Sequence, residues 1–173
     1  NMKFDMKNFE KKIKYKISEG QNFIEYSEVG INYLKNIPRI IKRNYGALLI
    51  IDYGYLEKKM KNTLQAISNH KHTNLLNNIG NCDITHNLNF WLFKKIIQNK
   101  KELKGLITTQ RNFLIKLGIE KRAEIMSKKL PFSNKIDVYY RLKRLIDKKQ
   151  MGDLFKVMLI KNKSNKFNLG FEK

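Results

Sequence analysis

Residues 46–55, GALLIIDYGY, decide the fold: five apolar residues follow a glycine and the run ends at Asp52. A short unbroken apolar run of this kind predicts a strand buried on both faces, as in a parallel sheet covered by helices. In open α/β sheets the ligand crevice lies beyond the carboxyl ends of the strands. We therefore expect Asp52, Tyr53 and Tyr55 at a crevice, with Gly54 allowing a sharp exit. The alternative is a structural turn in which Asp52 caps local backbone groups.

The composition indicates one folded domain. The chain has 173 residues, 42% of them hydrophobic, which is enough to bury a core. The apolar runs are too short to cross a bilayer, and the basic N-terminus has no apolar signal segment. Cys82 is the only cysteine, so an internal disulfide is impossible and a reducing compartment fits. The chain begins with Asn1 rather than Met, which suggests a piece of a longer protein.

The charge is strongly basic, with a formal net charge of +21. A basic chain can bind nucleic acid, but here lysine dominates, and only six residues are arginine, the side chain that reads bases and phosphates bidentately. The lysines are spread over the whole chain rather than grouped. We therefore expect nonspecific attraction to polyanions and not specific recognition of nucleic acid.

The periodicity predicts a single α/β domain. The apolar pattern alternates between period two and helical spacing along the chain. The expected elements are a hairpin of strands 9–18 and 23–27, a helix over 30–43, the strand at 46–52, an irregular loop over 70–81, a helix over 87–100, a strand over 103–108, a helix over 111–129 divided near Gly118, a helix over 134–147 and a strand over 155–161.

Few motifs offer chemistry of their own. The nine glycines form no GxG pair and no GxxxxGK loop, so no nucleotide site is visible. His70, His72 and His86 do not match metal-ligand spacings, so we expect no metal site. The best carboxylate candidates are Asp52 and Asp83, which can hold a ligand amine or guanidinium. The alternative for Asp83 is a capping role before the helix, where Thr85 or Asn87 can serve as N-cap.

Five blocks of sequence together resemble the closing half of the MidA-like family of S-adenosylmethionine-dependent methyltransferases. The blocks are GALLIIDYGY, TLQAISNHKH, GNCDITHNLNF, GLITTQRNFLIKLGIEKRAEIM and RLIDKKQMGDLFKVMLI, in this order. Mitochondrial relatives in this family are assembly factors for respiratory complex I and are associated with arginine methylation. The main departure within the blocks is Asn89, which stands where the family usually has an acid.

The resemblance implies a Rossmann-like class I methyltransferase fold without its first strands. Residues 46–52 would be the fifth strand, 103–108 the sixth and 155–160 the antiparallel seventh. Residues 1–30 would be a β-hairpin insertion, 31–161 the C-terminal half of the methyltransferase domain, and 162–173 a tail. The family's glycine-rich cofactor loop, acidic strand end and NE-x-x-D-A-x-P segment would lie upstream of Asn1.

The function implied is that of a protein-arginine N-methyltransferase acting on a complex I subunit. We expect S-adenosylmethionine to bind the full-length protein and not this chain alone, which would need the missing N-terminal half as its partner. The location would be the bacterial cytoplasm, or the mitochondrial matrix in a eukaryote. The alternatives are a non-catalytic fragment or a basic nucleic-acid-binding module. The catalytic residues are not identified, and the candidates for the substrate and cofactor pocket are Asp52, Tyr53, Gly54, Tyr55, His70, Asp83 and Thr85.

Overall fold

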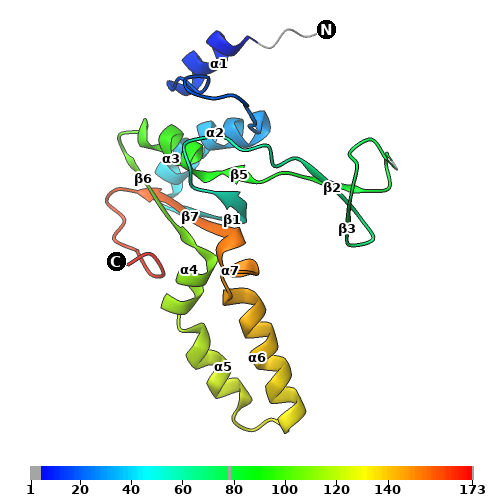
Figure 1. The fold of residues 1–173 in the computed structure, drawn as a ribbon. Helices are drawn as coiled ribbons and strands as arrows, with labels where there is room; N and C mark the ends of the chain where they lie inside the picture. Colours follow the sequence, from blue (N-terminus) through cyan, green and yellow to red (C-terminus); the bar gives the residue numbers. More distant parts are fainter. Residues whose placement is uncertain (1–4, 78, 173) are drawn as a thin grey trace.

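A four-stranded mixed sheet forms the centre of the molecule (Figure 1). The computed structural model describes residues 5–77 and 79–172. The strand order is β5 (Leu88–Asn89), β1 (Ala47–Tyr55), β7 (Phe155–Asn162) and β6 (Leu103–Thr109). β1 is parallel to β5, whereas β7 is antiparallel to both β1 and β6. The predicted α/β class, with a parallel pair and an antiparallel last strand, is confirmed.

Strand β7 is the most deeply buried part of the sheet. Its residues Val157 to Ile160 are 0–4% exposed, on both faces of the strand. Met158 lies opposite Ile50 of β1 and Ile107 of β6, so one side chain connects three strands on the same face. A continuous apolar run is what a strand covered on both faces requires.

Helices α2 (Glu28–Asn44) and α3 (Phe90–Gln98) supply the main core with the sheet. Ser27 begins α2, because its Oγ accepts a hydrogen bond from the Gly30 N–H at 3.0 Å. The helix contains Pro38, as the sequence allowed. The fully buried side chains from the two helices include Ile31, Leu34, Phe90, Leu92 and Ile97.

Strand β1 is formed where the sequence predicts it, but the expected burial on both faces is wrong. Leu48 and Ile50 pack against the core, whereas Leu49, Ile51 and Tyr53 are 41–47% exposed. On its side away from β7, only the last two residues of β1 pair, with β5. An apolar run shows that both faces can be covered, but it does not say that the described part of the chain covers them.

The predicted N-terminal hairpin is also wrong. Residues Met6–Ile13 form helix α1, and no described residue between 14 and 26 lies in a strand. Asp5 caps the helix through the Asn8 N–H at 3.0 Å. Phe9 and Ile13 are buried and four residues apart on one side of the helix, so the helical period prevails over the alternation that suggested a strand.

A second sheet flanks the loop predicted over residues 70–81: one strand takes residues 71–73, and the described residues 74–77 and 79–81 lie outside helices and strands, as predicted. It consists of β2 (Gln65–Ser68), β3 (Lys71–Thr73) and β4 (Asp83–Thr85), in the order β3–β2–β4, and projects from the body (Figure 1). Asn69 and His70 both have positive φ, 49° and 61°, and make the two-residue turn between β2 and β3. We call this three-stranded sheet the arm.

Four helices lie between β6 and β7: α4 (Gln110–Lys116), α5 (Ile119–Ser127), α6 (Phe132–Ile146) and α7 (Met151–Leu154). The predicted division at Gly118 is confirmed, since this glycine has a φ of 77° between α4 and α5. No helix in the described part of the chain is long and apolar enough to span a membrane.

The exposed face of β1 leads to a prediction about self-association. An apolar strand with an unpaired edge is a template for edge-to-edge aggregation. We expect Ile51→Thr, at a 47% exposed position, to lower aggregation in dynamic light scattering with little change in the melting temperature. The control is Ile160→Ala at a fully buried position, which should cost about 2–5 kcal/mol of unfolding free energy. An equal loss of stability in both variants would show that the Ile51 face is covered.

Candidate functional site

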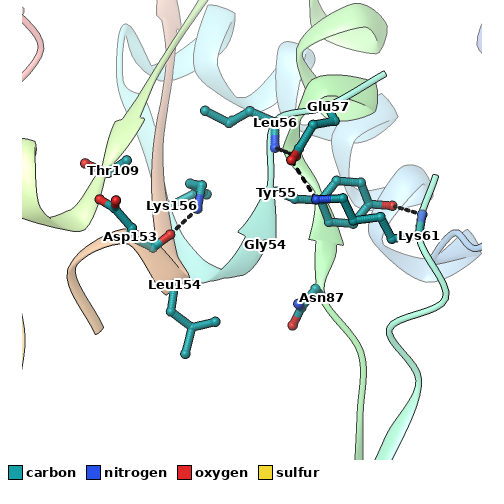
Figure 2. Close-up of a pocket in the computed structure, with 10 residues that line it drawn as sticks. All are labelled: Gly54, Tyr55, Leu56, Glu57, Lys61, Asn87, Thr109, Asp153, Leu154 and Lys156. Carbon is teal, nitrogen blue, oxygen red and sulfur yellow. Dashed lines mark hydrogen bonds and ion pairs between the residues drawn. The ribbon is translucent and has the colours of Figure 1, made fainter. Parts of the chain in front are cut away.

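A cavity of about 410 Å³ lies where β1 and β6 end and β7 begins (Figure 2). We call it the crevice. It is at the carboxyl end of two strands that are parallel to each other, as the ligand sites of α/β sheets are. The lining residues come from four separate parts of the chain, and they are Gly54, Tyr55, Leu56, Glu57, Lys61, Asn87, Thr109, Asp153, Leu154 and Lys156.

Glu57 is one of two carboxylates in the crevice, and it is held in place by two donors. Its Oε1 atom lies 2.6 Å from Lys61 Nζ, and its Oε2 atom accepts a hydrogen bond from the Leu56 N–H at 2.9 Å. The bond with Lys61 lowers the pKa of Glu57, so this side chain is anionic at neutral pH. Figure 2 shows both interactions at the rim of the crevice.

Asp153, on α7, is the second carboxylate. The ammonium of Lys156 donates a hydrogen bond to the backbone oxygen of Asp153, not to its side chain. The carboxylate itself makes no hydrogen bond or ion pair with the described residues. Burial lowers the pKa of Lys156, and the charges of Asp153 and Glu57 oppose that shift. Because its carboxylate has no partner among the described residues, the Asp153 side chain is open to a ligand.

Tyr55 forms the apolar wall of the crevice and keeps its hydroxyl neutral. Burial raises the pKa of the phenol, and the backbone N–H of Lys61 and the amide of Asn89 oppose the rise. The phenol oxygen accepts a hydrogen bond from the Lys61 N–H at 3.4 Å. The Asn89 side chain caps α3 through the Leu92 N–H at 3.0 Å, and its Nδ2 lies close enough to the Tyr55 hydroxyl to affect the pKa of that group, but without the geometry of a hydrogen bond.

Glycine is required at position 54 for a different reason from the one that the sequence suggested. The chain does not turn sharply there; β1 continues through Gly54 to Tyr55 and pairs with β5. A Cβ atom at this position would lie 2.5 Å from the Leu88 carbonyl oxygen and 2.5 Å from the Phe90 ring. Glycine is therefore required because β5 and the start of α3 approach the β1 backbone so closely.

The structure divides the predicted site residues into two groups. Gly54 and Tyr55 line the crevice, and Asp52 and Tyr53 precede them on β1 without lining it. The Asp52 carboxylate accepts a hydrogen bond from the Tyr53 N–H at 2.7 Å, and the Tyr53 ring lies 4.1 Å from that of Phe155. The functional roles of these four residues remain predictions.

The other three predicted site residues, His70, Asp83 and Thr85, lie on the arm, outside the lining of the crevice. Asp83 pairs with Ile67 inside a strand, so its expected capping role is wrong. The helix that follows begins at Phe90 and its cap is Asn89, not Thr85 or Asn87. In the described residues no cluster of potential ligands could hold a metal ion.

Sequence reasoning missed most of the lining residues. They lie in a polar segment after β1, at the end of β6 and in the segment that enters β7. The signal lay in the blocks that carry the family resemblance: MGDLFKV contains three of them, Asp153, Leu154 and Lys156, and two other blocks contain Thr109 and Asn87. The missed residues are Leu56, Glu57, Lys61, Asn87, Thr109, Asp153, Leu154 and Lys156.

Residues 1–109 match the sequence profile of a family described as "Putative S-adenosyl-L-methionine-dependent methyltransferase". The chain belongs to this family. The mitochondrial protein arginine methyltransferase NDUFAF7 of Danio rerio is 28% identical over 136 residues, which are 79% of this chain and 32% of that protein. Its counterpart in Xenopus tropicalis is 27% identical over 142 residues, 80% of this chain and 32% of that protein. The chain thus spans about a third of the length of these relatives.

Solved structures show the same fold. An uncharacterised protein from Burkholderia thailandensis superimposes with a TM-score of 0.64 at 21% identity, over 84% of this chain and 38% of that one. A second structure from this organism, bound to S-adenosyl-homocysteine, gives 0.56 at 23% identity, over 74% of this chain and 33% of that one. The bound molecule agrees with the family's description, which names S-adenosyl-L-methionine.

Among the described residues, neither β1 nor β6 is followed by a glycine-rich turn, and β6 passes directly into α4 at Thr109. That this chain alone does not bind the cofactor stays a prediction. The crevice is instead lined by two carboxylates and two ammonium groups, which suit a charged side chain better than an adenosine ring. A charged side chain of a substrate is therefore the ligand that the lining of the crevice favours.

The close approach at Gly54 predicts a large effect of one methyl group. We expect Gly54→Ala to prevent folding or to cost more than about 2 kcal/mol, because the new Cβ meets backbone and a buried ring. The control is Gly46→Ala, where a Cβ would meet no atom within 4 Å, and where the unfolding free energy should change by less than about 1 kcal/mol. Urea unfolding measures both; equal effects would contradict the role of Gly54.

The Asn89 cap predicts a destabilising substitution. Asn89→Ala removes the oxygen that accepts the Leu92 N–H at the start of α3, at a residue that is only 6% exposed. We expect the unfolding free energy to fall by about 1–2 kcal/mol, measured by urea denaturation. An unchanged unfolding free energy would show that this side chain does not hold the start of α3.

Proposed function

We propose that this chain is the substrate-binding part of an S-adenosylmethionine-dependent protein-arginine methyltransferase. The observation that carries the proposal is the pair of carboxylates, Glu57 and Asp153, in a crevice at the carboxyl ends of β1 and β6. The family membership supports methyl transfer, and the names of the NDUFAF7 relatives support an arginine substrate.

The chemistry of the crevice suits a guanidinium group. Carboxylates bind guanidinium through short, charge-assisted hydrogen bonds that also fix its orientation. Methyl transfer needs the nucleophilic nitrogen in line with the methyl–sulfur bond, so orientation contributes much of the rate. Asp153 has a free carboxylate for this purpose, whereas Glu57 is already paired with Lys61 and would define the opposite wall. Tyr55 is 6% exposed and Lys61 Nζ lies 5.3 Å from its ring centroid, so this ring helps to hold the Lys61 side chain that pairs with Glu57.

The remaining parts of the proposal rest on the family resemblance. The protein substrate is a subunit of respiratory complex I, and the place of action is the mitochondrial matrix or, in a bacterium, the cytoplasm. The cofactor supplies the methyl group, and residues preceding this segment in the complete enzyme bind it. A non-catalytic role is the second candidate, favoured by the lack of a cofactor loop among the described residues.

The test measures methyl transfer to a protein substrate by the complete enzyme. Asp153→Asn keeps the shape and removes the charge, so we expect the rate to fall by about one to two decades, the equivalent of roughly 1.5–3 kcal/mol for one charged hydrogen bond. The melting temperature should stay within a degree or two. The matched control is Glu102→Gln, an exposed carboxylate paired with Lys42 at 3.0 Å, which should leave the rate unchanged.

Asp52→Asn belongs in the same experiment because the sequence singled Asp52 out. A lower rate with unchanged stability would support its predicted place in the pocket. Lower stability with full activity would leave it as the residue that binds the Tyr53 N–H. Full activity of Asp153→Asn would refute the role of Asp153, and a wild-type enzyme without methyl transfer would refute the proposed function.

A further inference from the structure

Helices α5 and α6 form a hairpin that projects from the carboxyl-end side of the sheet (Figure 1). They pack against each other and against α4, and α6 also contacts α7. Only Ala123, Ser127 and Ile146 of the two helices are buried. A hairpin that buries so little of its own apolar surface leaves much of it for another molecule.

One side of α6 carries an exposed aromatic and aliphatic stripe. Phe132, Ile136, Tyr139 and Tyr140 are 79%, 54%, 47% and 68% exposed. They recur three, four and eight residues apart, so they share one side of the helix. A groove of about 480 Å³ runs along them, and we call this surface the α6 face; its residues are Phe132, Lys135, Ile136, Tyr139, Tyr140 and Lys143.

The charges of the α6 face have one sign. Lys135 and Lys143 are eight residues apart, about 12 Å along the helix axis, and no carboxylate lines the groove. Two carboxylates of the hairpin already have cationic partners. Asp137 pairs with Arg141 at 2.9 Å, and Glu124 pairs with Lys121 at 2.7 Å. The two lysines therefore remain available to acidic groups of a partner.

We infer that the α6 face binds an acidic amphipathic helix of another protein. The apolar stripe of such a helix would cover Ile136 and Tyr140, and carboxylates two turns apart would reach Lys135 and Lys143. A second copy of this chain fits poorly. An antiparallel pairing of two α6 faces would bring Lys135 against Lys143 of the other copy, and each copy carries a net charge of +21.

The base of the hairpin connects this surface to the crevice. Gln110 Nε2 and Arg111 Nη1 donate hydrogen bonds to the Leu145 and Ile146 carbonyl oxygens at 2.9 and 2.7 Å. They fix the end of α6 beside the start of α4, which follows Thr109 in the crevice. A helix bound to the α6 face would thus be held beside the crevice. If the proposed function holds, that helix belongs to the methylated protein; the binding itself does not depend on methyl transfer.

The test uses two designed 18-residue helical peptides with a fluorescent label. Both carry the same leucine stripe; one has glutamate and the other lysine on the flanks. Fluorescence anisotropy should show the glutamate peptide binding about tenfold more tightly than the lysine peptide. Ile136→Glu should weaken its binding by at least about tenfold. Lys135→Glu combined with Lys143→Glu should reverse the preference toward the lysine peptide.

The matched control is Ile40→Glu on α2, because Ile40 is 55% exposed and Ile136 is 54% exposed. It should bind like wild type, and circular dichroism should show that all variants keep their helices. Equal binding of the two peptides, or an equal loss in Ile40→Glu, would overturn the inference. Dimerisation in sedimentation that Ile136→Glu abolishes would make a second copy the occupant. Binding to anionic vesicles without binding to the glutamate peptide would make it a lipid surface.

Discussion

The position of β7 between β1 and β6 is the constraint on which the rest of the structure depends. Its four apolar residues from Val157 to Ile160 have almost no exposed surface, and they contact side chains of both neighbouring strands. Because β7 is antiparallel to both neighbours, β1 and β6 are parallel to each other although they never pair. Removing apolar area at β7 would therefore separate the two strands and unfold the core they share.

The crevice is a direct result of this arrangement. β1 and β6 both end where β7 begins, so the segments that follow and precede these ends meet in one place. The turn after β1 contributes Glu57 and Lys61, the end of β6 contributes Thr109, and α7 contributes Asp153 just before β7. These three segments are far apart in the sequence. The site is thus built by the order of the strands rather than by any single motif.

Much of the fold could be predicted because its strands are apolar runs of the right length. The sequence predicts β1, β6 and β7 to within a few residues, and the resemblance numbers them as the fifth, sixth and antiparallel seventh strands of the family sheet. The N-terminal segment was mistaken because Ile13, Tyr15 and Ile17 alternate, while the helix is set by Phe9 and Ile13, with Ile17 beyond its end. The prediction that both faces of β1 are buried was wrong because an apolar strand shows only that its faces are hydrophobic. It does not show that other residues pack against both of them.

The site was less predictable for a physical reason. Glu57, Lys61 and Asp153 lie in short polar segments whose composition resembles that of the solvated surface elsewhere. Only tertiary structure brings them together, and it is the combination of a place in the crevice with a carboxylate that has no partner among the described residues that distinguishes Asp153. Gly54 was identified, but for flexibility; the requirement is the close approach of the Leu88 carbonyl and the Phe90 ring, which no local pattern shows.

The net charge and the crevice can be reconciled through the range of electrostatic forces. At physiological salt, charges more than about 8 Å apart are largely screened, so a ligand in the crevice responds mainly to the groups that line it. There, Glu57 is paired with Lys61, Lys156 lies against the backbone oxygen of Asp153, and the Asp153 carboxylate is free. A cationic side chain can therefore bind a strongly basic chain at this one place.

The α6 face is inferred to select the opposite charge, since two lysines and no described carboxylate line its groove. A protein that places an arginine in the crevice and an acidic helix on α6 would satisfy both surfaces, whereas a polyanion such as a nucleic acid would match the lysines and be repelled by Asp153.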